Sequence, residues 1–453
     1  MSEENKNRQQ LACHYIQDNY VAFQRLRFDC IAQKVQLREE ESSPQHLPDG
    51  QGDCQMRWRY ITNADINSMV CDCCAETGAN ISAKEILTVL NAGSRYIPRV
   101  HPLREYVLSL RPYTPDQPDW IDMVASQVRI ITNNIPLANT ASGEENNTTP
   151  SYTTLHNTTP NAKGLWRVCF KKWFVAMVAS WLKDEVVNHQ VLVLIGRQGI
   201  FKTTWLEHLI PPHLRAYCCK LANATQLSKD DRLRIAEFGL INMDELDAMT
   251  PRELNAMKSI ITSTDVNERA AYGYTKERRV RLASFCASSN KREFLTDMTG
   301  NRRWLPFEVD SIQNPFHTTL PYDLMYAEAL YLIDNDFNYW FDLEEIDTLE
   351  QHNEVFRAQD SEEQLLPILF DIPAEGKGEF MTTAQISERL VSYGNIKKPM
   401  PVSQLGMLLG KAGYRAVTRG SRNARVRGWI VYQRNTDEIN ANKALLAKDG
   451  VTM

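Results

Sequence analysis

The clearest chemical signal in the sequence is a loop suited to binding phosphate. The apolar run at 191–195 leads into Gly196, and Lys202 and Thr203 follow at the start of an expected helix. Glycines allow backbone amides to surround phosphate oxygens, and a helix directs its positive end at the anion. Lys202 would reach the β and γ phosphates of a nucleotide, and the Thr203 hydroxyl would ligate Mg²⁺. The predicted nucleotide-binding residues are Gly196, Gln198, Gly199, Ile200, Phe201, Lys202, Thr203 and Thr204.

One position departs from the usual loop. The residue before the lysine is commonly glycine, and here it is Phe201. The alternative interpretation is an ordinary strand–turn–helix joint with a solvated lysine. The buried strand before the loop and the helix after it favour the phosphate site, and the effect of Phe201 on hydrolysis stays open.

Acidic and amide side chains follow two later strands. Asp244 and Glu245 end the apolar run at 238–243, and Asn290 ends the run at 281–289. Ligands gather beyond the carboxyl ends of parallel strands. We therefore expect Asp244 to bind Mg²⁺, Glu245 to activate water and Asn290 to orient that water. The alternatives are a helix cap for the two acids and a plain loop position for the asparagine.

A pair of arginines completes the predicted catalytic set. Arg302 and Arg303 lie on a turn that begins with Gly300 and leads into an aromatic strand. One of them could reach the γ-phosphate bound by an adjacent subunit and stabilise the charge that develops during hydrolysis. Two solvated arginines on a turn are the alternative, and the sequence does not decide which arginine acts. The predicted catalytic residues are Lys202, Asp244, Glu245, Asn290, Arg302 and Arg303.

These segments together resemble the virulence-associated protein E family, whose ATPase core is similar to superfamily 3 helicases of the AAA+ class. The matching segments are 101–110, 196–204, 241–249, 257–290 and 294–307. The resemblance covers roughly 65–315, and its most specific part is the element at 299–304, which follows the strand that ends at Asn290. It implies ATP and Mg²⁺ as cofactors, and a homo-oligomeric ring, expected to be hexameric, with DNA in its pore. It also implies a replication role on prophages and mobile islands, with a primase or an initiator as a partner.

The resemblance further implies a DNA-contacting hairpin at 270–280. Tyr272, Tyr274 and Lys276 suit its tip, because stacking and phosphate contact both tolerate any base sequence. A surface hairpin without a ligand is the alternative. Lys258 and Arg269 match positions where the family favours basic residues near the nucleotide.

A parallel sheet is required to bring the predicted site together. Apolar runs alternate with helical segments between 161 and 325, which is typical of an α/β fold with a parallel sheet. We therefore expect a P-loop ATPase core of the AAA+ type at 161–325.

Smaller parts are predicted on both sides of this core. A small α+β module is expected at 1–125, with a hairpin at 20–40, a third strand at 55–60 and helices from Thr62 onward. The segment 126–160 is rich in Asn, Thr and Pro, which favours a linker or long loop. After the core we expect a helical connector at 326–375, a winged-helix domain at 376–436 and a tail at 437–453.

The winged-helix segment carries a basic patch. Every charged residue between Gly410 and Asn435 is Lys or Arg. Arg419, Arg422 and Arg425 fall at the predicted hairpin tip, where a wing can lie along a phosphate backbone. A solvated surface without a ligand is the alternative.

Composition restricts the partners and the location. The chain has 453 residues and a formal net charge of −5, so DNA would have to bind local basic patches. The sequence starts without a signal peptide and has no apolar run of about 18 residues, so we expect a cytoplasmic protein without a membrane partner. Cys71 and Cys74 have the spacing of a zinc half-site, but no second pair follows. We expect buried thiols there and predict no zinc.

Three functions are compatible with these features. The leading one is an ATP-dependent DNA helicase or translocase. The second is a DNA-bound ATPase switch, in origin melting or phage defence, that does not unwind processively. The third is a structural DNA-binding protein with a degenerate phosphate loop, for which Phe201 is the only support.

Overall fold

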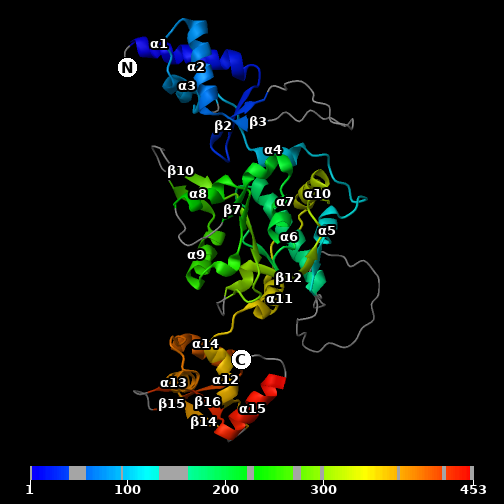
Figure 1. Cartoon of the computed structure of the whole chain (residues 1–453), viewed down its shortest axis with the longest axis vertical. Coiled ribbons are helices and arrows are strands. Elements are labelled where there is room, and N and C mark those ends of the chain that lie inside the picture. The colour runs from blue at the N-terminus through cyan, green and yellow to red at the C-terminus, as the bar shows by residue number, and fades with distance from the viewer. Residues whose placement is uncertain are drawn as a thin grey trace. The chain divides into compact units, whose positions relative to one another are not determined.

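The computed structural model of the chain forms two compact units, Met1–Phe356 and Arg357–Met453 (Figure 1). The structure describes residues 3–39, 58–92, 95–131, 162–221, 229–268, 277–295, 300–374, 378–420 and 425–448. The boundary divides the predicted connector at 326–375, because its first helices pack on the core and its last helix belongs to the second unit. Among the helices that are described, none is both long enough and apolar enough for a membrane span.

The N-terminal part of the first unit has a four-stranded sheet of order β3-β2-β1-β4. The hairpin predicted at 20–40 is confirmed, since β1 (Leu26–Asp29) and β2 (Lys34–Arg38) pair antiparallel. The third strand is confirmed as β3 (Trp58–Tyr60), and β4 (Arg99–Val100) completes the sheet. Side chains of this sheet and of helices α1 (Glu3–Ile16), α2 (Asn63–Thr77) and α3 (Ala83–Leu90) form a separate small core.

Thr62 is the N-cap of helix α2. The Thr62 side chain accepts a hydrogen bond from the Asp65 amide, and the Asp65 carboxylate accepts one from the Thr62 amide. The two bonds form a capping box. On the same helix Cys73 is buried, Cys74 is partly buried and Cys71 is exposed. The expectation of inward-facing thiols is therefore wrong for Cys71. Within the described residues, no group of three or more His, Cys, Asp or Glu is placed to hold a metal.

A six-stranded sheet forms the centre of the first unit, with the order β5-β12-β6-β11-β8-β7 (Figure 1). Its strands are β5 (Val128–Ile130), β6 (Val191–Ile195), β7 (Cys218–Leu221), β8 (Leu240–Met243), β11 (Ser284–Ser289) and β12 (Trp304–Ile312). Every pairing in it is parallel except that of the edge strand β5 with β12. The predicted α/β fold with a parallel sheet is confirmed. The expected linker at 126–160 begins differently, because β5 joins the sheet.

Alternate residues of the central strands are buried on opposite faces. Along β6, Leu192 and Leu194 pack in one apolar cluster while Val191, Val193 and Ile195 pack in the other. Residues of α5 (Trp120–Ala125), α6 (Ala162–Leu182), α7 (Lys202–His208) and α10 (Tyr322–Asp334) share the first cluster. Residues of α8 (Lys229–Glu237) and α9 (Pro251–Thr262) share the second. Both faces are covered, as expected for continuous apolar strands.

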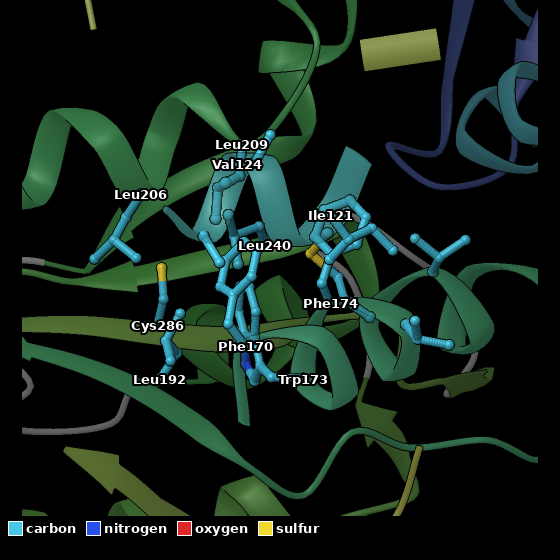
Figure 2. Close-up of a cluster of buried hydrophobic side chains, with 14 of the residues drawn as sticks. Ile121, Val124, Phe170, Trp173, Phe174, Leu192, Leu206, Leu209, Leu240 and Cys286 are labelled. Atoms are coloured by element: carbon cyan, nitrogen blue, oxygen red, sulfur yellow. The ribbon is translucent and has the colours of Figure 1, made fainter. Parts of the chain in front are cut away.

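Helix α6 is the largest apolar element against this sheet. Phe170, Trp173 and Phe174 project from it toward Leu192, Leu240 and Cys286 of the strands (Figure 2). Its buried indoles also find polar partners, because Trp173 Nε1 donates to Phe285 O at 3.0 Å and Trp181 Nε1 to Gly239 O at 3.2 Å. These bonds fix the helix directly to the connections and strands that carry the predicted site.

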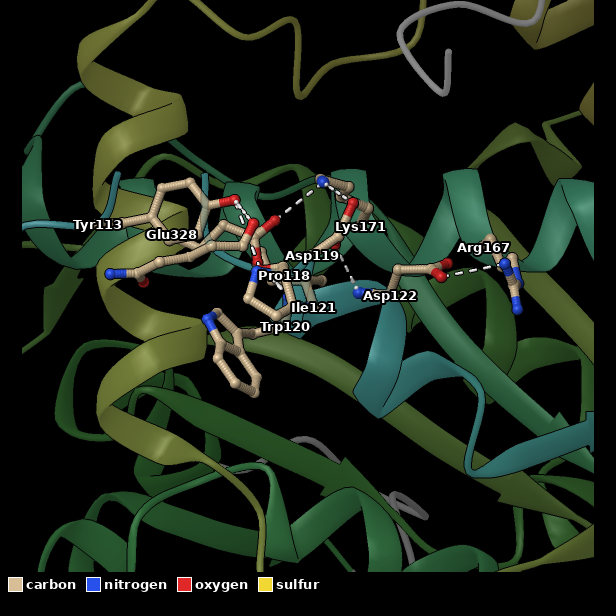
Figure 3. Close-up of polar contacts among 10 residues, drawn as sticks. Tyr113, Pro118, Asp119, Trp120, Ile121, Asp122, Arg167, Lys171 and Glu328 are labelled. Carbon is tan, nitrogen blue, oxygen red and sulfur yellow. Dashed lines mark hydrogen bonds and ion pairs between the residues drawn. The ribbon is translucent and has the colours of Figure 1, made fainter. Parts of the chain in front are cut away.

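A polar network joins α5, α6 and α10 (Figure 3). Lys171 Nζ lies 2.6 Å from Asp119 Oδ2 and 2.9 Å from Glu328 Oε1. The second oxygen of Glu328 accepts the backbone amides of Trp120 and Ile121, at the start of α5. Because Glu328 is buried, these donors replace the water that its carboxyl group loses.

Helix α11 (Leu343–Asn353) holds the arginine turn in place. Its N-terminal half is tied to α6 by a buried ion pair between Lys172 and Glu345, with 2.7 Å between Nζ and Oε1. Its C-terminal end reaches the turn, where Asn353 Nδ2 donates to Asn301 O at 2.8 Å and to Trp304 O at 3.0 Å. The ion pair therefore supports the position of Arg302 and Arg303.

The buried pair generates a stability prediction. We expect Glu345→Gln to lower the free energy of unfolding by about 3 kcal/mol, because it leaves the Lys172 ammonium buried without its counterion. Urea unfolding of the full chain, followed by tryptophan fluorescence, measures the change.

The matched control is the double variant Lys172→Met with Glu345→Gln, which removes both charges and retains a side chain able to cap α11. It should recover most of the lost stability. A double variant as unstable as the single one would show that the ion pair is not the cause.

The second unit contains a helix, a turn, a second helix and a hairpin, which is the order that the predicted winged-helix domain requires. Helices α13 (Thr383–Gly394) and α14 (Val402–Lys411) precede β15 (Arg415–Arg419) and β16 (Val426–Gln433), which pair antiparallel. Strand β14 (Glu379–Met381) and β13 (Phe370–Asp371) also pair with β16. The predicted tail contains a helix, α15 (Thr436–Lys448), whose Asn442 bonds to Pro367 O in α12 (Ser361–Leu369).

Candidate nucleotide-binding site

The loop between β6 and α7 packs closely against the neighbouring strand. The amide of Gly196 donates to Ser289 O at 3.1 Å. A Cβ atom at Gly196 would lie 2.7 Å from Val309 O, so only glycine fits there. Gln198 and Gly199 are exposed and Ile200 is partly buried, which leaves the outer part of the loop accessible.

Phe201 occupies the glycine position in a glycine-like conformation. Its backbone has φ 67° and ψ 17°, in the left-handed region. Side chains other than glycine pay roughly 1–2 kcal/mol for this conformation. The Phe201 ring meets the ring of Phe316 edge-to-face, with 6.3 Å between centroids. The loop therefore keeps the backbone shape of its usual form at the cost of local strain.

Lys202 is directed into the loop. Its side chain is almost fully buried, and Nζ donates to Gly196 O at 2.7 Å, Arg197 O at 2.8 Å and Asn290 Oδ1 at 3.1 Å. Burial lowers the pKa of Lys202, and the negative charges of Asp247 and Asp244 oppose that shift. A phosphate oxygen that entered the loop could replace one of these three acceptors.

Asp244 accepts two hydroxyl hydrogen bonds on one carboxylate oxygen. Thr203 Oγ1 donates to Oδ1 at 2.8 Å and Ser288 Oγ at 2.6 Å. Burial alone would raise the pKa of Asp244, but the bonds from Ser288 and Thr203 outweigh it and the pKa lies below its usual value. A carboxylate and hydroxyl groups are the oxygen ligands that Mg²⁺ accepts, so Thr203 and Asp244 could hold that ion together.

Glu245 and Asn290 lie beside this group. Glu245 is exposed, and its backbone is left-handed with φ 54°. Its amide donates to Asp244 Oδ1 at 3.2 Å. The amide of Asn290 donates to Asp247 Oδ1 at 3.2 Å, while its side chain accepts from Lys202. Glu245, with its left-handed backbone, and Asn290, which is held by Asp247 and Lys202, thus lie at the rim of the phosphate loop.

The sheet order explains this convergence. Strand β11 lies between β6 and β8, and Ser289 is paired with Ile195, directly before the loop. Three parallel strands therefore end side by side, and each contributes a polar group beyond its carboxyl end. Ser288 and Asp247 also belong to the cluster and were missed by the sequence analysis. The serine pair before Asn290 was the available signal, because polar residues rarely end a buried strand without a partner.

Arg302 and Arg303 lie at the opposite end of the sheet. They form a short 3₁₀ turn just before β12, whose Trp304 is paired with Val191, the first residue of β6. The strand from Val191 to Gly196 spans about 16 Å at the usual rise per residue. Burial and the nearby cations Arg281, Arg303 and Arg302 lower the pKa of His189, which precedes β6. The structure therefore does not bring these arginines to the phosphate loop of the same chain.

Lys258 lies near the arginine turn. A Cβ atom at Gly300 would lie 3.6 Å from Arg303 Nη1 and 4.0 Å from Lys258 Nζ. The lysine, on α9, thus shares the amino-terminal edge of the sheet with the arginines. Arg269 lies outside the described residues.

The predicted DNA-contacting hairpin is described only at its base. Strands β9 (Asp265–Glu268) and β10 (Glu277–Val280) pair antiparallel, with Glu268 opposite Glu277. Tyr272, Tyr274 and Lys276 lie outside the described residues. Arg279 of β10 ties the base to the core, because Nη1 lies 2.7 Å from Glu237 Oε1 and Nη2 donates to Ile31 O.

The basic hairpin of the second unit is exposed. Arg419 and Arg425 are solvent-accessible on either side of its tip, and Arg422 lies outside the described residues. The Arg419 guanidinium lies 4.7 Å from the ring centre of Phe380, which orients the side chain without neutralising it. Arg434 instead pairs with Asp371 at 2.7 Å, so it does not add net charge to the patch.

Comparison with known proteins finds a family model that matches the middle of the chain. Residues 143–358 match the virulence-associated protein E-like domain. This segment contains the phosphate loop, Asp244, Asn290 and the arginine turn, and the resemblance seen in the sequence is confirmed there. The match begins later than the expected start near residue 65. No curated protein matches the chain.

Solved structures of one protein align with most of the chain. The apo structure of the NrS-1 C-terminal region is 11% identical with a TM-score of 0.42, and the alignment covers 91% of this chain and 97% of that one. An A-form apo structure of the same region is 10% identical with a TM-score of 0.36, covering 90% and 96%.

The strain at Phe201 generates a second prediction. We expect Phe201→Gly to be more stable than Phe201→Ala by about 1 kcal/mol, because both lose the ring and only glycine adopts φ 67° without strain. Urea midpoints of the two variants give the difference. Equal midpoints would mean that the left-handed conformation is not retained.

Proposed function

We propose that the chain is a Mg²⁺-dependent ATPase. The observation that carries this proposal is the polar cluster of Lys202, Thr203, Asp244 and Asn290, joined by hydrogen bonds at the ends of three adjacent parallel strands. Lys202 binds the β and γ phosphates, and Thr203 and Asp244 hold Mg²⁺. Glu245 activates the attacking water, and Asn290 orients it.

The ATPase acts on DNA, as a helicase or translocase of the mobile-element replication type. Support comes from the family match of residues 143–358 and from the exposed arginines of the second unit. Those arginines contrast with a chain whose net charge is −5. Contact with the phosphate backbone is the chemistry that such a patch favours.

Hydrolysis takes place between subunits of a homo-oligomer. Arg302 and Arg303 are about a strand length away from the phosphate loop of their own chain, yet they stand on a turn that α11 holds rigidly. An adjacent subunit that presents its arginine turn to this loop would complete the site.

The central prediction concerns turnover. Lys202→Ala and Glu245→Gln should each lower ATP hydrolysis by at least about 100-fold, since one removes the phosphate-binding cation and the other the general base. Wild-type turnover should rise with single-stranded DNA. Phosphate release, measured with and without DNA, checks both statements.

Lys291→Ala is the matched control, because Lys291 is an exposed lysine next to Asn290 with no assigned role. Its turnover should equal that of the wild type. Absence of hydrolysis in the wild type, with protein that is folded and oligomeric, would exclude the motor. Turnover without strand separation on a forked duplex would favour the ATPase switch.

A mixing experiment tests the shared site. Neither Lys202→Ala nor the double variant Arg302→Ala with Arg303→Ala should hydrolyse ATP alone. Their equal mixture should recover about a quarter of wild-type turnover, because random assembly places both intact partners at one interface in four.

A mixture that is as inactive as its separate components would contradict an arginine supplied by the neighbour. ATP binding by the double arginine variant is the control, because its phosphate loop is unchanged.

A further inference from the structure

An exposed aromatic side chain lies beside the phosphate loop. Phe316 has 70% of its surface accessible. It meets the ring of Phe201 with 6.3 Å between centroids and the ring of His208 with 5.7 Å, edge-to-face in both cases. Despite these two contacts, most of the Phe316 surface is open to solvent.

The segment that carries Phe316 is held in place from both sides. The Phe316 amide donates to Asn314 Oδ1 at 3.0 Å, and the neighbouring Pro315 is buried. After this turn, Tyr322 OH donates to His208 O at 2.8 Å and Tyr326 OH to Leu209 O at 3.1 Å. These bonds fix the connection between β12 and α10 to the end of α7. Phe316 is therefore exposed on a tethered backbone.

The sheet order determines which part of a nucleotide would meet this ring. Asp244 and Ser288, which belong to the metal side of the loop, follow β8 and end β11, on one side of β6. Phe316 follows β12, on the other side of β6. A triphosphate with its γ end near Asp244 and Glu245 and its nucleoside on the β12 side would bring the base to Phe316.

We propose that Phe316 forms a stacking platform for the nucleobase of the bound nucleoside triphosphate, with the Phe201 and His208 rings packed against it. The proposal rests on the phosphate site of the proposed function and adds the part that binds the base. An aromatic face binds a base by stacking, with little dependence on its identity. The left-handed Phe201 then has a role, because it places a ring where glycine would leave none.

Two ligands separate this proposal from the phosphate site itself. The probes are Mg²⁺–ATP and Mg²⁺–tripolyphosphate, which lacks a base, and binding of each to the full chain is measured by calorimetry. Phe316→Ala should weaken ATP binding about tenfold, because one stacked base is lost. It should leave tripolyphosphate binding unchanged. Phe316→Trp should retain ATP binding.

The control is Phe23→Ala, which removes a phenylalanine of similar exposure, 66%, from the N-terminal part of the chain. Both ligands should bind this variant as they bind the wild type. Equal weakening of ATP and tripolyphosphate by Phe316→Ala would mean that the ring only supports the loop, and no change in either would mean that the base lies elsewhere. Both results overturn the stacking platform, whereas a wild type that binds neither ligand would overturn the phosphate site.

Discussion

The parallel insertion of β11 between β6 and β8 is the constraint on which the candidate site depends. Residues 191–196, 240–245 and 284–290 are distant in sequence, and each ends in or leads into residues of the candidate site. Parallel pairing places those ends at one edge, where Thr203 and Ser288 both donate to Asp244, and Asn290 accepts from Lys202. Without that strand order the same residues would form three separate loops. The strand order is stabilised by the burial of apolar side chains in two clusters, one on each face of the sheet. Helix α6 is the largest element of the first cluster.

Two of the non-glycine residues with left-handed backbone lie at the same edge. Phe201 and Glu245 are both left-handed although neither is glycine, and each stands next to a residue of the cluster. Such conformations persist only where the surroundings hold them, and they are common at functional sites. The left-handed backbone of Phe201 is accompanied by a ring contact with Phe316. In Glu245 the left-handed backbone turns the chain sharply after Asp244, so that the carboxyl group faces solvent rather than the core.

The two ends of the sheet carry different groups. The carboxyl end collects the groups suited to phosphate and Mg²⁺, whereas the amino end carries the arginine turn and Lys258. Helix α11 links the second end to α6 through Lys172 and Glu345, and α6 in turn packs on the strands of the first. A buried ion pair adds little net stability, but it requires a defined geometry because either charge is costly to bury without its counterion. Such a pair therefore favours one position of α11 and of the arginine turn that it contacts.

Much of this organisation was determined by the sequence alone. The apolar runs that became β6, β8 and β11, the helix α6, the N-terminal hairpin and the helix–turn–helix–hairpin order all follow from local periodicity and turn residues, which act within a few residues. Asp244 and Asn290 were recognisable because each directly follows such a run, and Lys202 because it ends the glycine-containing loop after β6. Only the tertiary structure decided which strands are neighbours, that β5 leaves the expected linker to join the sheet, and that Ser288 and Asp247 enter the cluster. It also placed the arginine turn at the far end of the sheet and Phe316 beside Phe201. These are contacts between segments separated by many residues, and the free energy that selects them comes from packing the whole core rather than from any local pattern.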